Sequence, residues 1–226
     1  MRKMHKKNDK FTPDWYFEQL MQEGGEGLIA GVDEAGRGPL AGPVVAAAVI
    51  LVPGTCPDGL NDSKILSHRQ REQLYTEILT HGQIGIGLAE PEEIDRLNIL
   101  WASMVAMQRA VADLPLRPHG LLVDGNRCPE FDIPARAIVR GDRKSLSIAA
   151  ASIVAKVTRD RLMGQACVRF PHYNLSGHKG YPTKAHRELL RTHGPCPVHR
   201  RSFAPVRDAW AHHRSRPAPL SNPPKD

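Results

Sequence analysis

Apolar residues form short runs along the chain that predict β-strands. The first two runs lie at 28–33 and 44–52, and a turn rich in Gly and Pro separates them. Three later runs predict further strands over 83–89, 120–124 and 135–139. Two strands come first and the others alternate with helical segments. This order predicts an α/β fold with a mixed sheet.

Segments with helical periodicity lie around these strands. The spacing of apolar residues predicts helices over 13–23, 67–80, 90–112, 145–163 and 183–192. Ser67 is expected to cap the second of these helices. The stretch 145–163 is rich in alanine, which permits close packing on a sheet. We expect residues 170–182 to form a loop.

The charge is divided unevenly between the two parts of the chain. The formal net charge is +7, yet residues 156–226 carry 14 Lys/Arg and 4 Asp/Glu, while residues 1–155 carry 17 and 20. A basic last third beside an acidic body suggests that one part holds a polyanion and the other processes it. A basic, solvated surface without a partner is the alternative.

Cysteine usage and hydropathy exclude several classes of protein. The four cysteines contain no C-x-x-C pair, so neither a zinc knuckle nor a disulfide framework is indicated. No apolar run reaches 18 residues, and the N-terminus lacks the apolar core of a signal peptide. We therefore expect a cytoplasmic protein that does not enter a membrane.

Three aspartates close predicted strands beside a glycine, namely Asp33, Asp124 and Asp142, and Glu34 follows the first of them. Side chains at strand ends commonly gather at one edge of an α/β sheet. Carboxylate oxygens select Mg²⁺ or Mn²⁺ over zinc, and two such ions suit the in-line displacement of phosphoryl chemistry. The alternative is a set of structural salt bridges to nearby arginines, namely Arg37, Arg127, Arg140 and Arg143.

Glu34 poses a geometric problem for such a site. Neighbours on a strand point to opposite faces, so Asp33 and Glu34 cannot both reach one metal from regular β geometry. We expect the strand to end or bulge at Glu34, which Gly36 would permit. The glycines of Gly36-Arg37-Gly38 leave the backbone open to a ligand, although no complete phosphate-loop pattern is present.

Several motifs together resemble ribonuclease HII. They begin at Asp33, Asp62, Val123, Gly141 and His178, reading DEAGRGPLAGPV, DSK, VDGN, GDRKSLSIAAASIVAK and HKGYPT, and HRRSF begins at His199. The match runs in order from about residue 28 to residue 208, and the motifs are specific only in combination. The resemblance implies a ribonuclease H-like mixed sheet flanked by helices, with a small C-terminal helical region.

The resemblance also implies an activity and a site. Ribonuclease HII hydrolyses the RNA strand of RNA/DNA hybrids and nicks on the 5′ side of a ribonucleotide embedded in duplex DNA, the activity of ribonucleotide excision repair. Its metal-binding carboxylates fall on Asp33, Glu34, Asp124 and Asp142, with two Mg²⁺ or Mn²⁺ ions expected. Its substrate contacts fall on Gly36, Arg37, Gly38, Lys64, Lys144, Ser145, Lys179 and Tyr181. The ring of Tyr181 would stack on the deoxyribose after the ribonucleotide.

The same resemblance divides the chain. We expect a basic tail and short helix over 1–27, a catalytic core over 28–166, a basic substrate-binding region over 167–210 and a disordered tail over 211–226. We expect a monomer, and the tail shows no clear sliding-clamp motif. The alternatives are a ribonuclease HIII-type nuclease or a hybrid-binding module without catalysis. The complete set of four acids argues against the binding module, because binding without catalysis would not need them.

Overall fold

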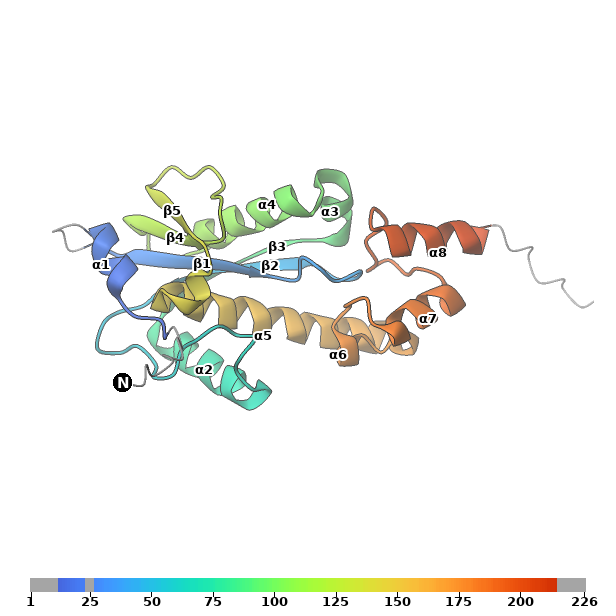
Figure 1. The fold of residues 1–226 in the computed structure, drawn as a ribbon, viewed down its shortest axis with the longest axis horizontal. Coiled ribbons are helices and arrows are strands. Elements are labelled where there is room, and N and C mark those ends of the chain that lie inside the picture. Colours follow the sequence, from blue (N-terminus) through green and yellow to red (C-terminus); the bar gives the residue numbers. More distant parts are fainter. Residues whose placement is uncertain (1–11, 23–26, 215–226) are drawn as a thin grey trace, which may run out of the picture.

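A five-stranded mixed sheet forms the centre of the protein (Figure 1). The computed structural model describes residues 12–22 and 27–214, so most of the expected N-terminal tail and residues 215–226 lie outside the described residues. The sheet order is β3-β2-β1-β4-β5. The strands are β1 (Ile29–Ala35), β2 (Val44–Ile50), β3 (Gln83–Ala89), β4 (Gly120–Asp124) and β5 (Ala135–Ile138). All five predicted strands are confirmed.

The first strand joins the two halves of the sheet. It pairs antiparallel with β2 and parallel with β4, and β4 pairs parallel with β5. Regular pairing with β2 continues at Glu34↔Ala46 and Ala35↔Val45. The predicted strand end or bulge at Glu34 is therefore wrong, because the ladder to β2 runs on for another residue.

Helices cover both faces of the sheet (Figure 1). The helix α4 (Ile99–Ala112) packs on one face, and α5 (Leu146–Arg169) packs on the other face beside α2 (His68–His81). The backbone of α5 comes so close to β1 that a Cβ at Gly31 would lie 2.1 Å from the carbonyl carbon of Ser147. The alanine-rich sequence of α5 permits this approach, as predicted.

One expected helix is divided in two. Residues 90–112 form α3 (Pro91–Leu97) and α4, and Asn98 separates them with a φ of 65°. The side chain of Asn98 accepts hydrogen bonds from the N–H groups of Leu100 and Trp101, which caps α4. The prediction of one continuous helix is wrong because Asn98 adopts this left-handed conformation and begins a new helix.

The C-terminal part adds helices beyond one end of the sheet (Figure 1). The expected loop over 170–182 contains η2 (Pro171–Tyr173) and α6 (Leu175–His178), which corrects that prediction. The helices α7 (Lys184–His193) and α8 (Ala204–Arg214) follow, and α1 (Tyr16–Gln22) lies near the other end of the sheet. Residues 211–214 are helical rather than part of a disordered tail. No helix within the described ranges is long and apolar enough to cross a bilayer.

Candidate active site

The parallel strands β1 and β4 bring the candidate carboxylates together. Val32 pairs with Val123 in the parallel register, so Asp33 and Asp124 follow at the same level on neighbouring strands. Asp142 lies in η1 (Gly141–Arg143), the turn after β5. The N–H of Gly141 donates to Asp124 Oδ1 at 2.6 Å, which ties this turn to the end of β4.

Asp33 is the most strongly perturbed acid of the site. Its side chain is buried, and its Oδ1 accepts a hydrogen bond from the N–H of Glu34 at 2.7 Å. Burial, followed by the charges of Glu34 and Asp124, raises the pKa of Asp33 well above its ordinary value. Among the described residues Asp33 has no ion pair. A cation beside it would relieve this repulsion.

Glu34 forms an ion pair with Arg37, which partly offsets its negative charge. Arg37 Nη1 lies 3.2 Å from Glu34 Oε1, and the side chain of Glu34 is only 11% exposed. Burial raises the pKa of Glu34 although Arg37 opposes the shift. The salt-bridge alternative thus holds for Glu34, whereas Arg143 pairs with Asp62 at 2.8 Å and not with one of the four acids.

Lys64 brings a positive charge to the acids from an exposed loop. Its Nζ lies 3.6 Å from Asp142 Oδ2 and 3.8 Å from Asp62 Oδ1. Partial burial opposes the effect, but Asp62 and Asp142 raise the pKa of Lys64. Burial and the charge of Asp124 raise the pKa of Asp142. Lys64 is therefore positively charged and lies next to Asp142.

The donor set suits a hard divalent cation. No group of three or more His, Cys, Asp or Glu side chains in the described part of the chain is arranged to hold an ion by itself. Mg²⁺ is usually bound by one or two carboxylates together with water and substrate phosphates, not by a complete protein cage. Closely spaced carboxylates with raised pKa values, among them Asp33 and Asp142, fit that kind of binding.

The glycine-rich turn, Gly36-Arg37-Gly38, lies beside Tyr181, the proposed junction reader, which is the residue expected to recognise the junction between RNA and DNA. Gly36 has a φ of 98°, and a Cβ there would lie 2.0 Å from Arg159 Nε, so only glycine fits. A Cβ at Gly38 would meet only the ring of Tyr181, 3.8 Å from its Cε1. The ring of Tyr181 is 43% exposed. The structure therefore brings Gly38 and Tyr181 together although 143 positions separate them.

The remaining predicted contacts differ in accessibility. Lys144 and Lys179 are partly exposed. Ser145 is fully buried, and its hydroxyl donates to Glu18 Oε1 at 2.6 Å and accepts from the N–H of Ile148. The hydroxyl of Ser145 thus caps α5, and the substrate contact of Ser145 stays a prediction.

Sequence reasoning missed three polar residues around the site. Asp62 is buried and holds Arg143 through hydrogen bonds to Nε and Nη2, and Arg159 and Arg200 are buried below the glycine-rich turn. Asp62 belongs to the quoted DSK motif, which could have identified it. The two arginines resemble the other basic residues of this region, so no pattern in the sequence distinguishes them.

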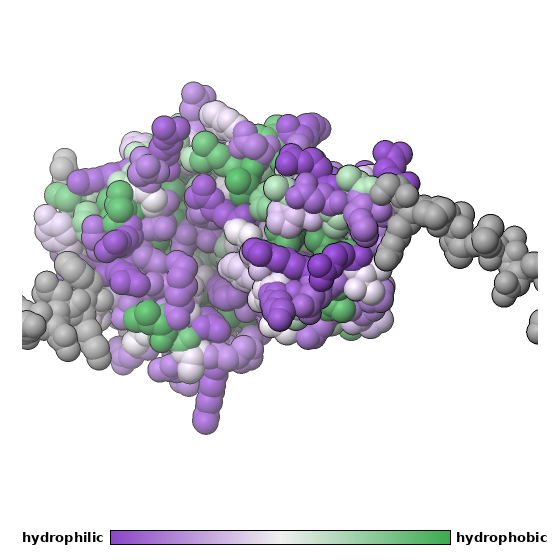
Figure 2. Space-filling model, turned by 45° about the vertical axis from the view of Figure 1, so that its right-hand side comes forward, coloured by the Kyte–Doolittle hydropathy of each residue, from purple (hydrophilic) through white to green (hydrophobic). Residues whose placement is uncertain are grey.

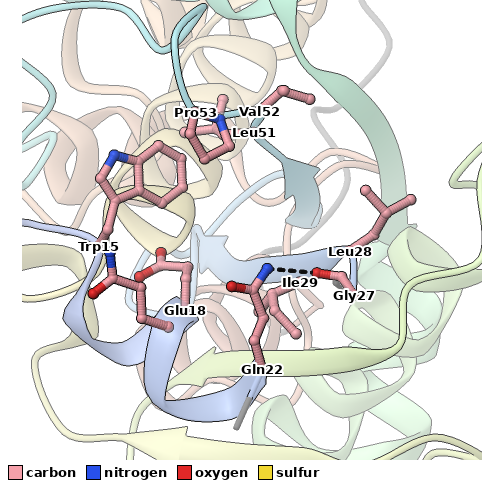
Figure 3. A pocket seen from close by; sticks show the side chains of 10 residues that line it. Trp15, Glu18, Gln22, Gly27, Leu28, Ile29, Leu51, Val52 and Pro53 are labelled. Atoms are coloured by element: carbon pink, nitrogen blue, oxygen red, sulfur yellow. Dashed lines mark hydrogen bonds between the residues drawn. The ribbon is translucent and has the colours of Figure 1, made fainter. Parts of the chain in front are cut away.

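None of the four candidate carboxylates lines the largely apolar pocket shown in Figure 3. It has a volume of about 200 Å³ and is lined by Trp15 and Glu18 of the N-terminal segment, Leu28 and Ile29, and the turn after β2. Ile29 begins β1, whereas Asp33 lies near its other end. The candidate site is thus the edge of the sheet that carries the carboxylates, and not this pocket.

Fold and site together define a class of protein. A mixed sheet whose parallel strands end in carboxylates, next to a basic helical region, is typical of metal-dependent nucleases with a ribonuclease H-like fold. The family model described as ribonuclease HII matches residues 30–206. The chain belongs to the ribonuclease HII family, and it is an endoribonuclease of the ribonuclease H type that depends on divalent metal and acts on nucleic acid.

Curated relatives cover most of the chain. The ribonuclease HII of Maricaulis maris is 62% identical over 182 residues, which is 80% of this chain and 84% of the relative. The ribonuclease HII of Shewanella amazonensis is 56% identical and covers 81% of this chain and 89% of the relative.

Solved structures share the fold. The ribonuclease H2 of Pyrococcus horikoshii OT3 has a TM-score of 0.69 at 28% identity, and the match covers 83% of this chain and 99% of that one. A PCNA:RNase HII complex from Archaeoglobus fulgidus has a TM-score of 0.61 at 28% identity and covers 76% and 93% of the two chains. The structure of Bst-RNase HIII in complex with Mn²⁺ has a TM-score of 0.60 at 18% identity, covers 84% and 71%, and shows the fold alone.

Proposed function

We propose that this enzyme nicks duplex DNA on the 5′ side of an embedded ribonucleotide and leaves a 5′-phosphate and a 3′-OH. The observation that carries the proposal is that Asp33 and Asp124 lie side by side at the ends of β1 and β4, while the turn that follows β1 brings Gly38 against Tyr181. The 2′-OH is the group by which a protein distinguishes RNA from DNA, and bare glycine backbone can approach it closely.

Asp33, Glu34, Asp124 and Asp142 are proposed to hold two divalent ions, Mg²⁺ or Mn²⁺. Although Asp33 and Glu34 are neighbours in a regular ladder, the charge of Glu34 raises the pKa of Asp33, so the two carboxylates lie within electrostatic reach of each other. Such ions stabilise the attacking and leaving oxygens of an in-line displacement. The Mn²⁺ bound by the structurally similar Bst-RNase HIII is in keeping with this choice. Burial raises the pKa of Asp33 and of Asp142, so the charged form of each carboxylate is costly unless a cation lies beside it. A bound metal ion would supply that cation.

The other groups orient the substrate. The backbone of Gly36, Arg37 and Gly38 is proposed to contact the ribonucleotide, and Tyr181 is proposed to stack on the next sugar. Lys64, Lys144 and Lys179 would bind phosphates. Residues 28–166 are proposed to supply the chemistry and part of the substrate contacts, and residues 167–210 to bind more of the duplex; the face of the molecule seen in Figure 2 is largely hydrophilic. We propose that the protein acts as a monomer.

A duplex with one ribonucleotide tests the proposal. We expect a nick on the 5′ side of that ribonucleotide with Mg²⁺ or Mn²⁺ and none with a chelator. Asp33→Asn and Asp124→Asn should each lower kcat by about a thousandfold, since metal-based charge stabilisation contributes several kcal/mol. Binding should remain within a fewfold, measured by fluorescence anisotropy.

Asp132→Asn is the matched control. Its side chain is 76% exposed and pairs with Arg117 at the surface. This variant should cleave at the normal rate. Full activity of Asp33→Asn would contradict the metal-site assignment, and a nick on the 3′ side would contradict the proposed specificity.

A further inference from the structure

Two buried arginines lie beneath the glycine-rich turn. Arg159 and Arg200 are 1% and 0% exposed, and neither forms an ion pair with a described acidic side chain. A buried charge is costly unless hydrogen bonds replace its lost hydration. Burial and the neighbouring Arg159 lower the pKa of Arg200 to about 9, so it remains protonated at neutral pH. Their partners must therefore be neutral groups.

These partners are backbone carbonyls of one short loop. Arg159 donates through Nε to Pro43 O at 3.0 Å and through Nη2 to Ala41 O at 3.1 Å. Arg200 donates to four carbonyl oxygens, those of Gly36 at 2.6 Å, Arg37 at 3.0 Å, Pro39 at 2.8 Å and Gly42 at 2.9 Å. The two guanidinium groups thus hold six of the eight carbonyls from residue 36 to residue 43.

This arrangement determines where the amide groups point. In a trans peptide the N–H is directed opposite to the C=O of the same plane. The carbonyls of Gly36 and Arg37 point to Arg200, so the N–H groups of Arg37 and Gly38 point away from it. Neither N–H donates to another described residue. The loop therefore presents two unused donors on the side opposite the buried arginines.

Arg159 also connects this loop to the segment that carries Tyr181. Arg159 Nη1 donates to the carbonyl of Lys179 at 3.1 Å, and the carbonyl of Gly180 accepts from the N–H of Leu40 at 2.8 Å. The loop that carries Tyr181 is thereby fixed against the glycine-rich turn. Arg159 thus bonds to both loops, whereas the guanidinium of Arg200 bonds only to the loop that contains the glycine-rich turn.

We propose that Arg159 and Arg200 are positioning residues that set the N–H groups of Arg37 and Gly38 to recognise the 2′-OH and the adjacent phosphate. This inference rests on the proposed function of that turn. A lysine in either place keeps the charge but cannot donate in the planar, forked geometry of a guanidinium. The loop would then lose its fixed orientation, and the discrimination between ribonucleotide and deoxyribonucleotide would fall.

The test compares two duplexes that differ by one 2′-OH, with binding measured by fluorescence anisotropy in chelator so that both remain uncut. Arg200→Lys and Arg159→Lys should each lower the ratio of the two affinities by about tenfold, the effect of losing one hydrogen bond of about 1.4 kcal/mol. Affinity for the all-DNA duplex should fall less than affinity for the duplex with the ribonucleotide, because the weakened contact to the adjacent phosphate is common to both duplexes and only the contact to the 2′-OH differs. The neighbouring exposed arginines provide controls, and Arg161→Lys and Arg201→Lys should leave the ratio unchanged.

A second pair of variants separates this inference from the proposed function. Gly38→Pro removes one N–H donor at an exposed position, whereas Gly38→Ala keeps it. If Gly38→Pro lowers the ratio but folded Arg200→Lys and Arg159→Lys do not, the arginines do not position the loop. If none of these variants lowers it, the turn does not read the 2′-OH. Unfolding of both arginine variants, measured by circular dichroism, would show a purely structural role and would also overturn the inference.

Discussion

At the scale of single residues, Tyr181 has the most specific expected role. Its ring lies beside Gly38 and is partly exposed, so it is placed to contact a sugar next to the ribonucleotide. In a uniform hybrid every nucleotide of the cleaved strand is RNA, and the junction that the ring would read is absent. Tyr181 therefore should contribute more to the cleavage of a single ribonucleotide than to the cleavage of a hybrid.

Tyr181→Ala tests this role. We expect kcat/KM to fall about tenfold or more on the duplex with one ribonucleotide, and clearly less on a uniform hybrid, since aromatic stacking on a nucleotide is worth about 1–3 kcal/mol. Steady-state kinetics on both substrates provide the measurement. Tyr16→Ala, at another exposed tyrosine, is the control and should change neither rate. Equal losses on both substrates would show that Tyr181 does not read the junction.

At the scale of elements, the start of α5 depends on a distant helix. Glu18 of α1 is buried, and its Oε1 accepts from the hydroxyl of Ser145 at 2.6 Å and from the N–H of Ser147 at 2.9 Å. A carboxylate at a helix N-terminus satisfies free N–H groups and interacts favourably with the helix dipole. The turn that carries Asp142 directly precedes this end of α5.

Glu18→Gln should weaken this contact. We expect the free energy of unfolding to fall by roughly 1–3 kcal/mol, the contribution of a hydrogen bond to a charged group, as measured by urea denaturation. Glu77→Gln, at a partly exposed position of α2 where Glu77 accepts one surface hydrogen bond from Gln73, serves as the comparison and should cost less than about 0.5 kcal/mol. A Glu18→Gln protein as stable as the unchanged protein would show that the charge at this end of α5 is not needed.

Elements were predictable where a local pattern determines them. The apolar runs identify all five strands, and Ser67 with Gln70 forms the capping box that begins α2. The break at Asn98 could not be predicted, because the apolar spacing continues across it while one left-handed residue changes the direction of the chain. The site was predictable in part, because acids at strand ends can be seen in the sequence. The role of Arg159 and Arg200 could not be predicted, because their partners are backbone carbonyls, which every residue carries.

At the scale of the whole molecule, a chain of histidines holds the C-terminal region together. His186 Nδ1 lies 3.0 Å from the carbonyl of Tyr181, and His186 Nε2 lies 3.1 Å from His199 Nε2. His199 Nδ1 in turn accepts from the N–H of Cys196 at 3.1 Å. The carbonyl of Tyr181 can only accept, so His186 Nδ1 carries a proton and, in the neutral ring, His186 Nε2 accepts from His199 Nε2–H. The Nδ1 of His199 is then free to accept from Cys196, so this set of bonds forms only when both rings are neutral. The ring of His178 stacks on His186 with a centroid distance of 4.1 Å.

This chain makes stability depend on pH. Burial, followed by His186, lowers the pKa of His199 to about 4 from an ordinary value of 6.5. The unfolded chain therefore binds a proton near pH 6.5 that the folded protein does not bind until about pH 4. The contribution to stability is complete above pH 6.5 and is lost as the pH falls toward 4. At pH 5 the loss should be about 2 kcal/mol from His199.

Urea denaturation at pH 7.5 and pH 5 measures this difference. His199→Phe should be less stable at pH 7.5, because it leaves His186 without its partner, but its stability should change less between the two pH values. His68→Gln, at a largely exposed histidine, should keep the full pH dependence. Equal pH dependence of His199→Phe and the unchanged protein would mean that other groups titrate in this range. Protonation of His199 disturbs its bonds to His186 and Cys196, whereas the Nδ1–H of His186 can still donate to the carbonyl of Tyr181, so the pH effect should appear in stability before it appears in the position of Tyr181.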